Sequence, residues 1–219
     1  MWYNGSNKQE RLAYCMDTSL RTQMLSAYKE NFCTLLRETE RNGIEDLISW
    51  LETETDFFTA PASTKSHGCY EGGLLIHSLS VYKILQNFCK NISGVRKDSI
   101  IIAALLHDLC KVNFYVKGIR NVKIPGERRW EEVEVYNIED SLPMGHGEKS
   151  VYMAMKHIRL SDEEAMAIRW HMGGYDDAAR SYVGGMAQSA AYQKYPMAAA
   201  LAMADMYDTY IIDNKQNNA

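Results

Sequence analysis

The sequence predicts an all-α helical bundle with a small antiparallel β insertion. Apolar residues recur at helical spacing through most of the 219-residue chain. The segment from Asp98 to Lys111 is apolar almost all round, which is typical of a helix at the centre of a fold. Val112 to Ile138 differs, because short runs of β-forming residues alternate there with the turn signals Lys117-Gly118 and Pro125-Gly126. We expect two or three short strands in that insertion.

The amino-terminal part predicts two helices. Helical spacing of apolar residues extends from about Lys8 to Asn42, Gly43 interrupts it, and Ile44 to Glu54 forms the next amphipathic segment. We expect residues 1–60 to form a helical extension packed on a core of residues 61–213. Residues 214–219 are polar and are predicted to form a flexible tail.

Helices also follow the β insertion. Ser161 and Glu164 form a capping-box pattern at the start of a helix that extends to Trp170. Met172 to Gln193 is rich in glycine, small residues and tyrosine, and we expect it to be a loop in part. The remaining predicted segments are a loop over Phe58–Tyr70 and helices over Glu71–Lys90, Gly147–Ile158 and Pro196–Ile212, the last with proline in its first turn.

Composition limits the function classes. The formal net charge is −4 and the sequence pI is about 5.9, which argues against sequence-independent wrapping of nucleic acid. A nuclease is not excluded, because a bound divalent metal brings its own positive charge. The five cysteines are odd in number and form no CxxC pair, which favours reduced thiols over a disulfide framework or a zinc ribbon.

The sequence predicts a cytoplasmic protein with no membrane partner. The start of the chain is polar and has no signal-peptide pattern. The longest apolar run, Ile100 to Leu106, is far too short to span a bilayer. A homo-oligomer stays open.

Four titratable residues stand at unusual places in this pattern. His77, Asp108 and Asp205 each fall on a predicted apolar helix face, and His107 precedes Asp108 directly. A carboxylate there is costly to bury unless it is paired or bound to a metal. Taken singly, a buried histidine is more often a hydrogen-bonded core residue, and Asp205 could cap a helix or pair with an arginine. Together they favour a metal site, because imidazole and carboxylate suit zinc, iron, manganese or nickel.

The order His77, His107-Asp108, Asp205 resembles the H…HD…D signature of the HD superfamily of metal-dependent phosphohydrolases. Glu71 to Val81 resembles the segment around the first metal histidine of bacterial HD-domain 3′-to-5′ exoribonucleases and phage HD proteins. Ala103 to Lys111 resembles the HD helix of the same group. The resemblance covers about two-thirds of the chain, roughly residues 66–209, and implies the HD-domain helical bundle.

The resemblance also implies a ligand set. HD-GYP phosphodiesterases are similar in having two additional histidines between the HD pair and the last aspartate, and His146 and His171 occupy that place. Two divalent transition-metal ions (Fe, Mn, Ni or Zn) are implied, with Asp108 as the bridge. The alternative is that His146 only begins a helix and His171 only caps one. The implied ligands are His77, His107, Asp108, His146, His171 and Asp205.

Further residues are candidates for catalysis and substrate binding. In HDxxK members of the family the lysine corresponding to Lys111 faces the site and contacts phosphate, so Asp108 and Lys111 are the predicted catalytic residues. The alternative for Lys111 is a favourable position at a helix carboxyl end. Cys110 has no evident base and is expected to be packed in its helix, and His157 is expected at the surface. The candidates for substrate contact are His67, Glu71, Lys149 and Arg169.

The implied reaction is hydrolysis of a phosphoester or phosphodiester of a nucleotide or short oligonucleotide by metal-activated hydroxide. The exoribonucleases of this resemblance carry an additional nucleic-acid-binding domain of the OB type, whereas the first ~60 residues here predict helices. A small phosphorylated substrate is therefore favoured, and short single-stranded nucleic acid stays open as a partner. An HD-type di-iron oxygenase and a non-catalytic nucleotide-binding module are the alternatives.

The β insertion, residues 112–138, is the expected specificity element because it follows Lys111 directly. Its basic side chains either clamp phosphate or only solvate an exposed hairpin, and the sequence favours neither. They are Lys117, Arg120, Lys123, Arg128 and Arg129.

Overall fold

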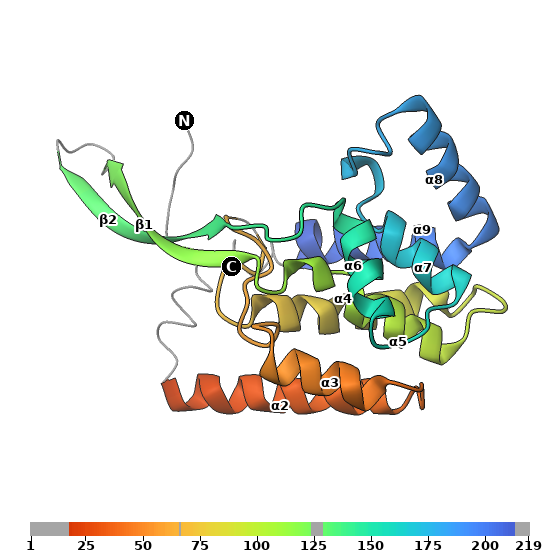
Figure 1. Ribbon diagram of the computed structural model, residues 1–219, viewed down its shortest axis with the longest axis horizontal. Coiled ribbons are helices and arrows are strands. Elements are labelled where there is room, and N and C mark those ends of the chain that lie inside the picture. Colours follow the sequence, from red (N-terminus) through yellow and green to blue (C-terminus); the bar gives the residue numbers. More distant parts are fainter. Residues whose placement is uncertain (1–17, 66, 124–128, 213–219) are drawn as a thin grey trace.

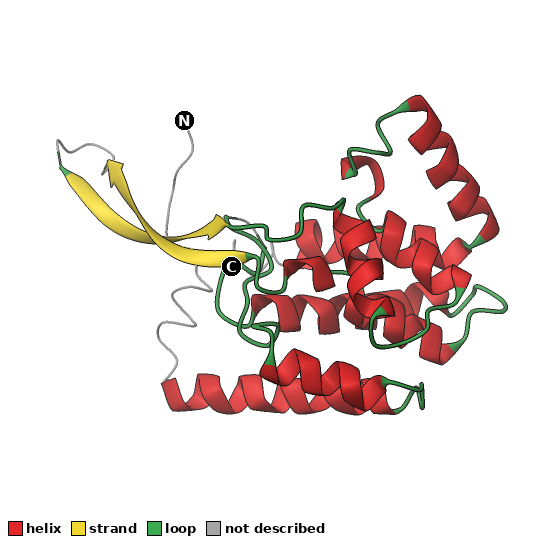
Figure 2. Cartoon of the chain, in the orientation of Figure 1, coloured by secondary structure: helices red, strands yellow, loops and turns green. Residues whose placement is uncertain are grey.

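The computed structural model describes residues 18–65, 67–123 and 129–212, and within them the chain forms a helical bundle with one two-stranded antiparallel sheet (Figures 1 and 2). The predicted all-α bundle with a small β insertion is confirmed. The central helices are α4 (Gly73–Cys89), α5 (Lys97–Leu106) and α9 (Pro196–Tyr207), and α4 packs against both others. Every residue of α5 from Ser99 to Leu106 is buried, which explains why this segment is apolar all round.

Two shorter helices complete the half of the bundle that follows the sheet. Helix α7 (Asp162–Trp170) packs on α5 and α9, and α6 (His146–Met155) packs on α7. The predicted capping box is present, because the Ser161 hydroxyl accepts the Glu164 amide and the Glu164 carboxylate accepts the Ser161 amide. As a result, the first turn of α6 and the last turn of α7 lie close to the carboxyl end of α5.

The amino-terminal helices α2 (Thr18–Arg37) and α3 (Ile44–Thr53) lie along one side of α4 and α5 (Figure 1). Phe32, Leu36 and Leu47 belong to the same hydrophobic cluster as the central helices. Gly43 separates α2 from α3 with a φ of 90°, and a Cβ there would lie 1.9 Å from the His157 carbonyl oxygen. The division at residue 60 stays a prediction, and residues 1–17, where the first helix was expected to begin, lie outside the described residues.

A partly buried ion-pair network joins these two parts of the chain. Arg41, which follows α2, contacts Asp98 at the start of α5 (2.8 Å between Nη2 and Oδ2) and also ion-pairs with Glu164 of α7. Ser99 donates a hydrogen bond to the same Glu164 carboxylate at 2.6 Å. Burial raises the pKa of Glu164, but the hydrogen bonds from Arg41 and Ser99 outweigh it and hold this pKa below its ordinary value.

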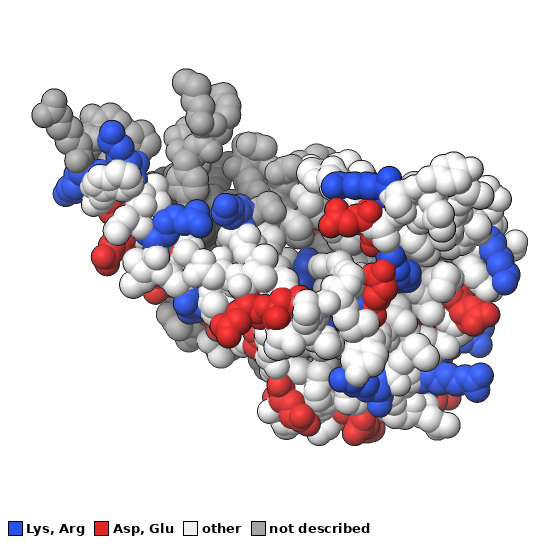
Figure 3. Space-filling model, turned by 45° about the horizontal axis from the view of Figure 1, so that its top comes forward, with Lys and Arg blue, Asp and Glu red and all other residues white. Residues whose placement is uncertain are grey.

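The β insertion is a hairpin that projects from the bundle (Figure 1). Strand β1 (Tyr115–Lys123) pairs antiparallel with β2 (Trp130–Ile138), in the register Tyr115↔Ile138 to Lys123↔Trp130. Nine residues per strand give an arm of about 30 Å. Figure 3 shows basic and acidic side chains interleaved along it, since Glu131, Glu132 and Glu134 accompany the basic residues. Residues 124–128, which include Arg128, lie outside the described residues.

The structure refines one predicted segment and corrects two. The segment Met172–Gln193, expected to be a loop in part, is a loop with a short 3₁₀ turn as far as Ser181, and Tyr182–Lys194 then forms α8, because the Ser181 hydroxyl accepts a hydrogen bond from the Gly184 amide at 3.0 Å. Gly184 is required there, since a Cβ would lie 1.9 Å from the Ala178 carbonyl oxygen. The expected single helix to Lys111 ends at Leu106 and continues as a 3₁₀ turn over Leu109–Lys111. Helix α9 likewise ends at Tyr207 and is followed by a π turn over Asp208–Ile212.

None of the helices in the described ranges could cross a membrane. The longest, α2 with 20 residues, carries charged and polar side chains along its whole length. The expected tail over residues 214–219 lies outside the described residues.

We expect Glu164→Gln to lower the free energy of unfolding by about 3 kcal/mol, because it removes the fully buried one of the two carboxylates that pair with Arg41. The folded-state pKa of this carboxyl is depressed, so its contribution is present above about pH 4.3 and is lost as pH falls. Urea unfolding of both proteins between pH 7 and pH 3 measures this. A stability gap that stays constant over this range would contradict the assignment.

Candidate metal centre

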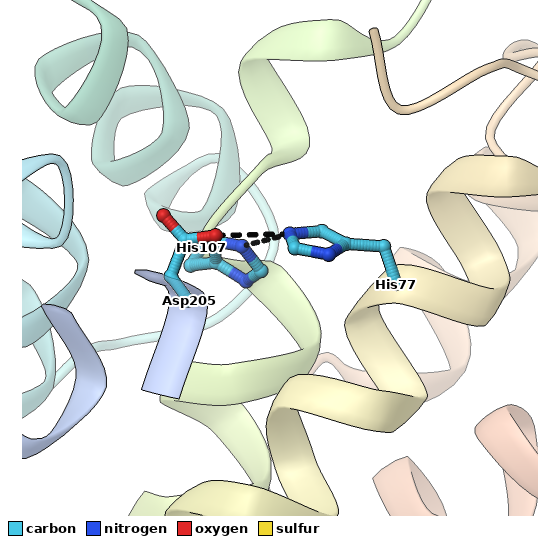
Figure 4. Close-up of side chains that lie close together, drawn as sticks. All are labelled: His77, His107 and Asp205. Atoms are coloured by element: carbon cyan, nitrogen blue, oxygen red, sulfur yellow. Dashed lines mark hydrogen bonds and ion pairs between the residues drawn. The ribbon is translucent and has the colours of Figure 1, made fainter. Parts of the chain in front are cut away.

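Five helices deliver titratable side chains to one point in the bundle. His77 comes from the first turns of α4, His107 from the end of α5 and Asp205 from α9 (Figure 4), and Asp108 follows His107 directly. The first residue of α6, His146, and the residue that ends α7, His171, complete the set. All six predicted ligands are therefore brought together, although they span 129 positions between the first and the last.

Asp108 lies at the centre of the cluster and is 2% exposed. Its Oδ1 lies 2.8 Å from Nε2 of His146 and 3.5 Å from Nε2 of His171. Its Oδ2 lies 3.4 Å from Nε2 of His107 and 3.6 Å from Nε2 of His77. Four imidazole nitrogens thus surround the two oxygens of one carboxylate, an arrangement that suits a bridging ligand.

The second carboxylate, Asp205, faces the same point. Its Oδ1 lies 3.2 Å from Nε2 of His77, and the Nε2 atoms of His77 and His107 are 3.3 Å apart (Figure 4). Among the described residues, three overlapping groups of atoms could each hold a metal ion. They are His77–His107–Asp205, His107–Asp108–His171 and Asp108–Cys110–His146.

Hydrogen bonds on the far side of three rings fix which nitrogen carries the proton. Nδ1 of His107 donates to the Ala104 carbonyl at 2.8 Å, and Nδ1 of His171 donates to the Ile168 carbonyl at 2.7 Å. Nδ1 of His77 contacts the Asp208 carboxylate at 2.7 Å. A carbonyl or carboxylate can only accept, so each Nδ1 holds the proton and each neutral ring presents an Nε2 lone pair to the cluster.

These lone pairs need an electron-pair acceptor. The facing Nε2 atoms of His77 and His107 repel each other unless a cation or a proton lies between them. Nε2 of His171 is buried without a hydrogen-bond partner among the described residues. Three converging imidazole lone pairs and two carboxylates are the donor set of a transition-metal site, so the residues present fit a bound divalent ion.

In the absence of a metal ion, the crowding of these groups shifts their pKa values. Burial lowers the pKa of His77, but hydrogen bonds with Asp205 and Asp208 outweigh it and raise the value to about 9. Burial raises the pKa of Asp108, whereas the charge of Lys111 and the contacts with His107 hold it well below its usual range. The carboxylates of the cluster therefore stay ionised only because positive charge lies beside them, and either protons on the imidazoles or a metal ion can supply it.

Lys111 lies beside the cluster. Its Nζ donates a hydrogen bond to Asp108 Oδ2 at 2.6 Å. The spacing had predicted that Lys111 and His107 share one helix, but Lys111 belongs to the 3₁₀ turn that follows α5. Burial lowers the pKa of Lys111, but the negative charge of Asp108 raises it above the ordinary value, so the ammonium is retained. Burial raises the pKa of Tyr115, at the root of the hairpin, to about 12, so its hydroxyl stays protonated.

Asp208 is a site residue that the sequence analysis missed. It is 5% exposed. One carboxylate oxygen accepts a hydrogen bond from Nδ1 of His77, and the other accepts one from the Ser80 hydroxyl. A carboxylate behind a metal-binding imidazole orients the ring and makes it a better donor. The available signal was its position three residues after Asp205, on the same side of the last helix.

Of the four residues predicted to contact substrate, His67 lies beside His77, and the other three are held in ion pairs. The His67 ring lies 5.1 Å from the His77 ring, and burial lowers the pKa of His67 to about 4. Glu71 is exposed and pairs with Arg21. Lys149 Nζ donates to Asp140 at 2.5 Å, and Arg169 is held by Glu148 at 2.5 Å and Asp176 at 2.7 Å. Glu71, Lys149 and Arg169 are each engaged in ion pairs, and their contact with substrate stays a prediction.

Two other expectations need correction. Cys110 is buried as expected, but its Sγ contacts His146 Nε2 at 3.2 Å, so the thiol does have a basic neighbour. The predicted surface residue His157 has only 12% of its side chain exposed. Its Nδ1 lies 2.6 Å from Asp46, and its ring stacks on Trp50 at 4.8 Å, which fixes α3 against the end of α6.

A cavity of about 50 Å³ borders the other side of His77. It is lined by His67, Ser80 and Asp208, among others, and has room for one or two water molecules but not for a nucleotide. Solvent reaches the cluster itself at the partly exposed side chains of His146 (30% exposed), Asp205 (16%) and Lys111 (11%). A substrate would therefore approach between the start of α6, the end of α9 and the root of the hairpin.

Residues 74–209 match the model of the HD domain family. The chain belongs to the HD domain family. This range begins within α4 just before His77 and ends after Asp208, so it contains all six predicted metal ligands and Asp208. The all-α fold agrees with this assignment, and HD domains bind divalent metals, as the convergent donor set requires.

The chain is also similar to dihydroneopterin 2′,3′-cyclic phosphate phosphodiesterase from Methanocaldococcus jannaschii. The two sequences are 43% identical over 63 residues, which is 26% of this chain and 25% of the archaeal protein. The chain thus spans about a quarter of the length of that relative. No solved structure matches the chain significantly.

We expect Asp208→Asn to weaken metal binding about 10- to 100-fold, because His77 loses the carboxylate that orients its ring. Calorimetric titration of the metal-free protein with Zn²⁺ or Mn²⁺ measures the change. Asp177→Asn is the matched control, since Asp177 is 96% exposed and lies outside the cluster. Equal affinities in the two variants would show that Asp208 has no role in the site.

Proposed function

We propose that this protein is a metal-dependent phosphohydrolase that cleaves a phosphoester or phosphodiester bond of a small nucleotide-like substrate. The observation that carries the proposal is the convergence of four imidazole Nε2 atoms on Asp108 and Asp205, with the Lys111 ammonium beside them. Membership of the HD domain family supports the hydrolase class. Similarity to the archaeal protein, which is named as a cyclic phosphate phosphodiesterase, supports a phosphodiester as the bond that is cleaved.

Each residue of the cluster has a definite task in this proposal. His77, His107, His146, His171 and Asp205 would hold the metal ions, and Asp108 would be shared between them. Two divalent ions are proposed, because the groups around Asp205 and around His146 lie on opposite oxygens of Asp108. When bound, such ions acidify water and neutralise charge on a phosphate. Iron, manganese, nickel and zinc all suit imidazole and carboxylate donors.

Lys111 and His67 act on the substrate. The Lys111 ammonium, 2.6 Å from Asp108, is positioned to stabilise negative charge on phosphate oxygens as it increases in the transition state. His67 is neutral at pH 7 because its pKa is about 4. Its buried Nδ1 has no hydrogen-bond partner among the described residues and can accept a hydrogen bond from a substrate hydroxyl.

The hairpin supports a small substrate but leaves room for a short oligonucleotide. Its root, at Tyr115, adjoins Lys111, so a group held at the cluster lies beside the arm. Along the arm Lys117, Arg120 and Lys123 stand opposite a strand with three glutamates, which weakens any continuous basic track. Nucleotides and 2′,3′-cyclic phosphates are therefore preferred over long strands.

The test is metal content together with hydrolysis. Protein purified without added metal is analysed for Fe, Mn, Ni and Zn, and the metal-loaded protein is assayed against phosphomonoesters, nucleotides, cyclic phosphates, cyclic dinucleotides and short RNA. We expect at least one phosphate ester to be hydrolysed, and the activity to disappear on chelation. We expect His107→Ala and Asp108→Asn to lose metal and activity together, while Asp177→Asn keeps both.

Three outcomes would reject the proposal. Full activity and full metal content in His107→Ala and Asp108→Asn would show that the site is elsewhere. An iron-loaded, coloured protein with oxygen-dependent turnover and no hydrolysis would instead establish a di-iron oxygenase. Thermal stabilisation by a nucleotide without any turnover would indicate a binding module.

We expect Lys111→Met to reduce kcat about 10²- to 10³-fold while the protein keeps its metal, because the ammonium acts on developing charge and not on the ions. Steady-state kinetics and elemental analysis of the same sample measure both quantities. Lys83→Met, at an exposed position of α4, is the control for loss of a lysine. Unchanged kcat in Lys111→Met would remove Lys111 from the catalytic set.

A further inference from the structure

One group of donor atoms in the cluster contains sulfur. The Sγ atom of Cys110, Nε2 of His146 and Oδ1 of Asp108 belong to one set whose atoms all lie within 4.8 Å of one another. Nε2 of His146 is 3.2 Å from the sulfur and 2.8 Å from the carboxylate oxygen. The other two groups in the cluster offer only nitrogen and oxygen. We infer that Cys110 is a thiolate ligand of the metal ion on the His146 side, which makes the two metal positions chemically different.

The local fold holds the sulfur in place. Helix α5 ends at Leu106, and the 3₁₀ turn over Leu109–Lys111 turns Cys110 towards the start of α6. The Cys110 amide donates to Ser150 Oγ at 3.1 Å, which ties this turn to α6 one helical turn after His146. The residue is 3% exposed, so its orientation is set by packing and not by solvent. A continued α-helix would have sent position 110 in another direction.

A second observation points to a ligand at this end of the cluster. Nε2 of His171 is fully buried, has no hydrogen-bond partner among the described residues, and lies 3.5 Å from the same Asp108 oxygen that contacts His146. Ligand atoms around a tetrahedral zinc ion are roughly 3.3 to 3.6 Å apart, judging from ordinary zinc–nitrogen and zinc–sulfur bonds. The contacts of 2.8 to 3.5 Å around Asp108 Oδ1 and His146 need only small adjustments to reach this spacing.

The consequence is metal selectivity at one position of the proposed pair. Thiolate favours zinc, cobalt and other softer ions over manganese and magnesium, whereas imidazole and carboxylate accept harder ions too. The position near His146 is therefore expected to select zinc or cobalt, and the His77–His107–Asp205 position to accept manganese or iron as well. Formation of the metal–sulfur bond releases the thiol proton to solvent.

Cobalt absorption tests this inference, which rests on the proposed metal-dependent function but has a separate readout. Metal-free full-length protein is titrated with Co²⁺, and the near-ultraviolet region is followed for the thiolate-to-cobalt charge-transfer band. We expect the band in the unmodified protein and in Cys89→Ser, a control for loss of a buried thiol on α4, and its loss in Cys110→Ser. We also expect Cys110→Ser to weaken binding of one Co²⁺ or Zn²⁺ tenfold or more, with Mn²⁺ binding unchanged.

The outcomes separate the two ideas. Cobalt binding without the band, or a band that persists in Cys110→Ser, would overturn the thiolate assignment while phosphate hydrolysis stands. A protein that binds no cobalt at all would overturn both. If Cys110→Ser does not fold, X-ray absorption of the zinc-loaded unmodified protein decides, since a sulfur neighbour at about 2.3 Å is expected and a nitrogen–oxygen shell alone would reject it.

Discussion

Everything in this bundle depends on the confinement of several imidazole lone pairs and two carboxylates in one buried volume. Asp108 is 2% exposed and His107 is fully buried, so water cannot satisfy them. The Nδ1 atoms of His107, His171 and His77 donate to the Ala104 carbonyl, the Ile168 carbonyl and Asp208, which leaves the Nε2 atoms of these three rings directed inward. A cation resolves this arrangement, and without one the cluster holds protons instead, as the raised pKa of His77 shows.

The architecture follows from that requirement. The donors come from the ends or inner faces of α4, α5, α6, α7 and α9, so these five helices must meet with their relevant turns at one level. Helix α5 is buried on all sides because it carries the central His107-Asp108 pair to the middle of the bundle. The amino-terminal helices contribute no donor, but Arg41 fixes α5 and α7 to each other through Asp98 and Glu164. A rigid relation between those two helices sets the distance between His107 and His171.

The sequence predicted the bundle and the six donors for a clear reason. Polar residues on apolar helix faces break the rule that governs the rest of the core, so His77, Asp108 and Asp205 stand out, and the family resemblance then assigned His146 and His171. Asp208 and Cys110 gave no such signal. An aspartate in the last turn and a cysteine in an apolar segment both satisfy ordinary core or capping patterns, and only the breaks in α5 after Leu106 and in α9 after Tyr207 direct them to the site.

Positive charge alone does not identify the residues that contact substrate in this site. Lys149 and Arg169 are basic residues close in sequence to His146 and His171, yet each is neutralised by nearby carboxylates. Lys111 is also paired, but its partner Asp108 is the residue that a metal would share. In the proposed function, a divalent ion held by Asp108 would compete with Lys111 for its negative charge, which would leave the ammonium available to a phosphate. Whether a buried lysine or arginine in this site can bind phosphate therefore depends on the carboxylate with which it pairs, and that partner is visible only in the folded structure.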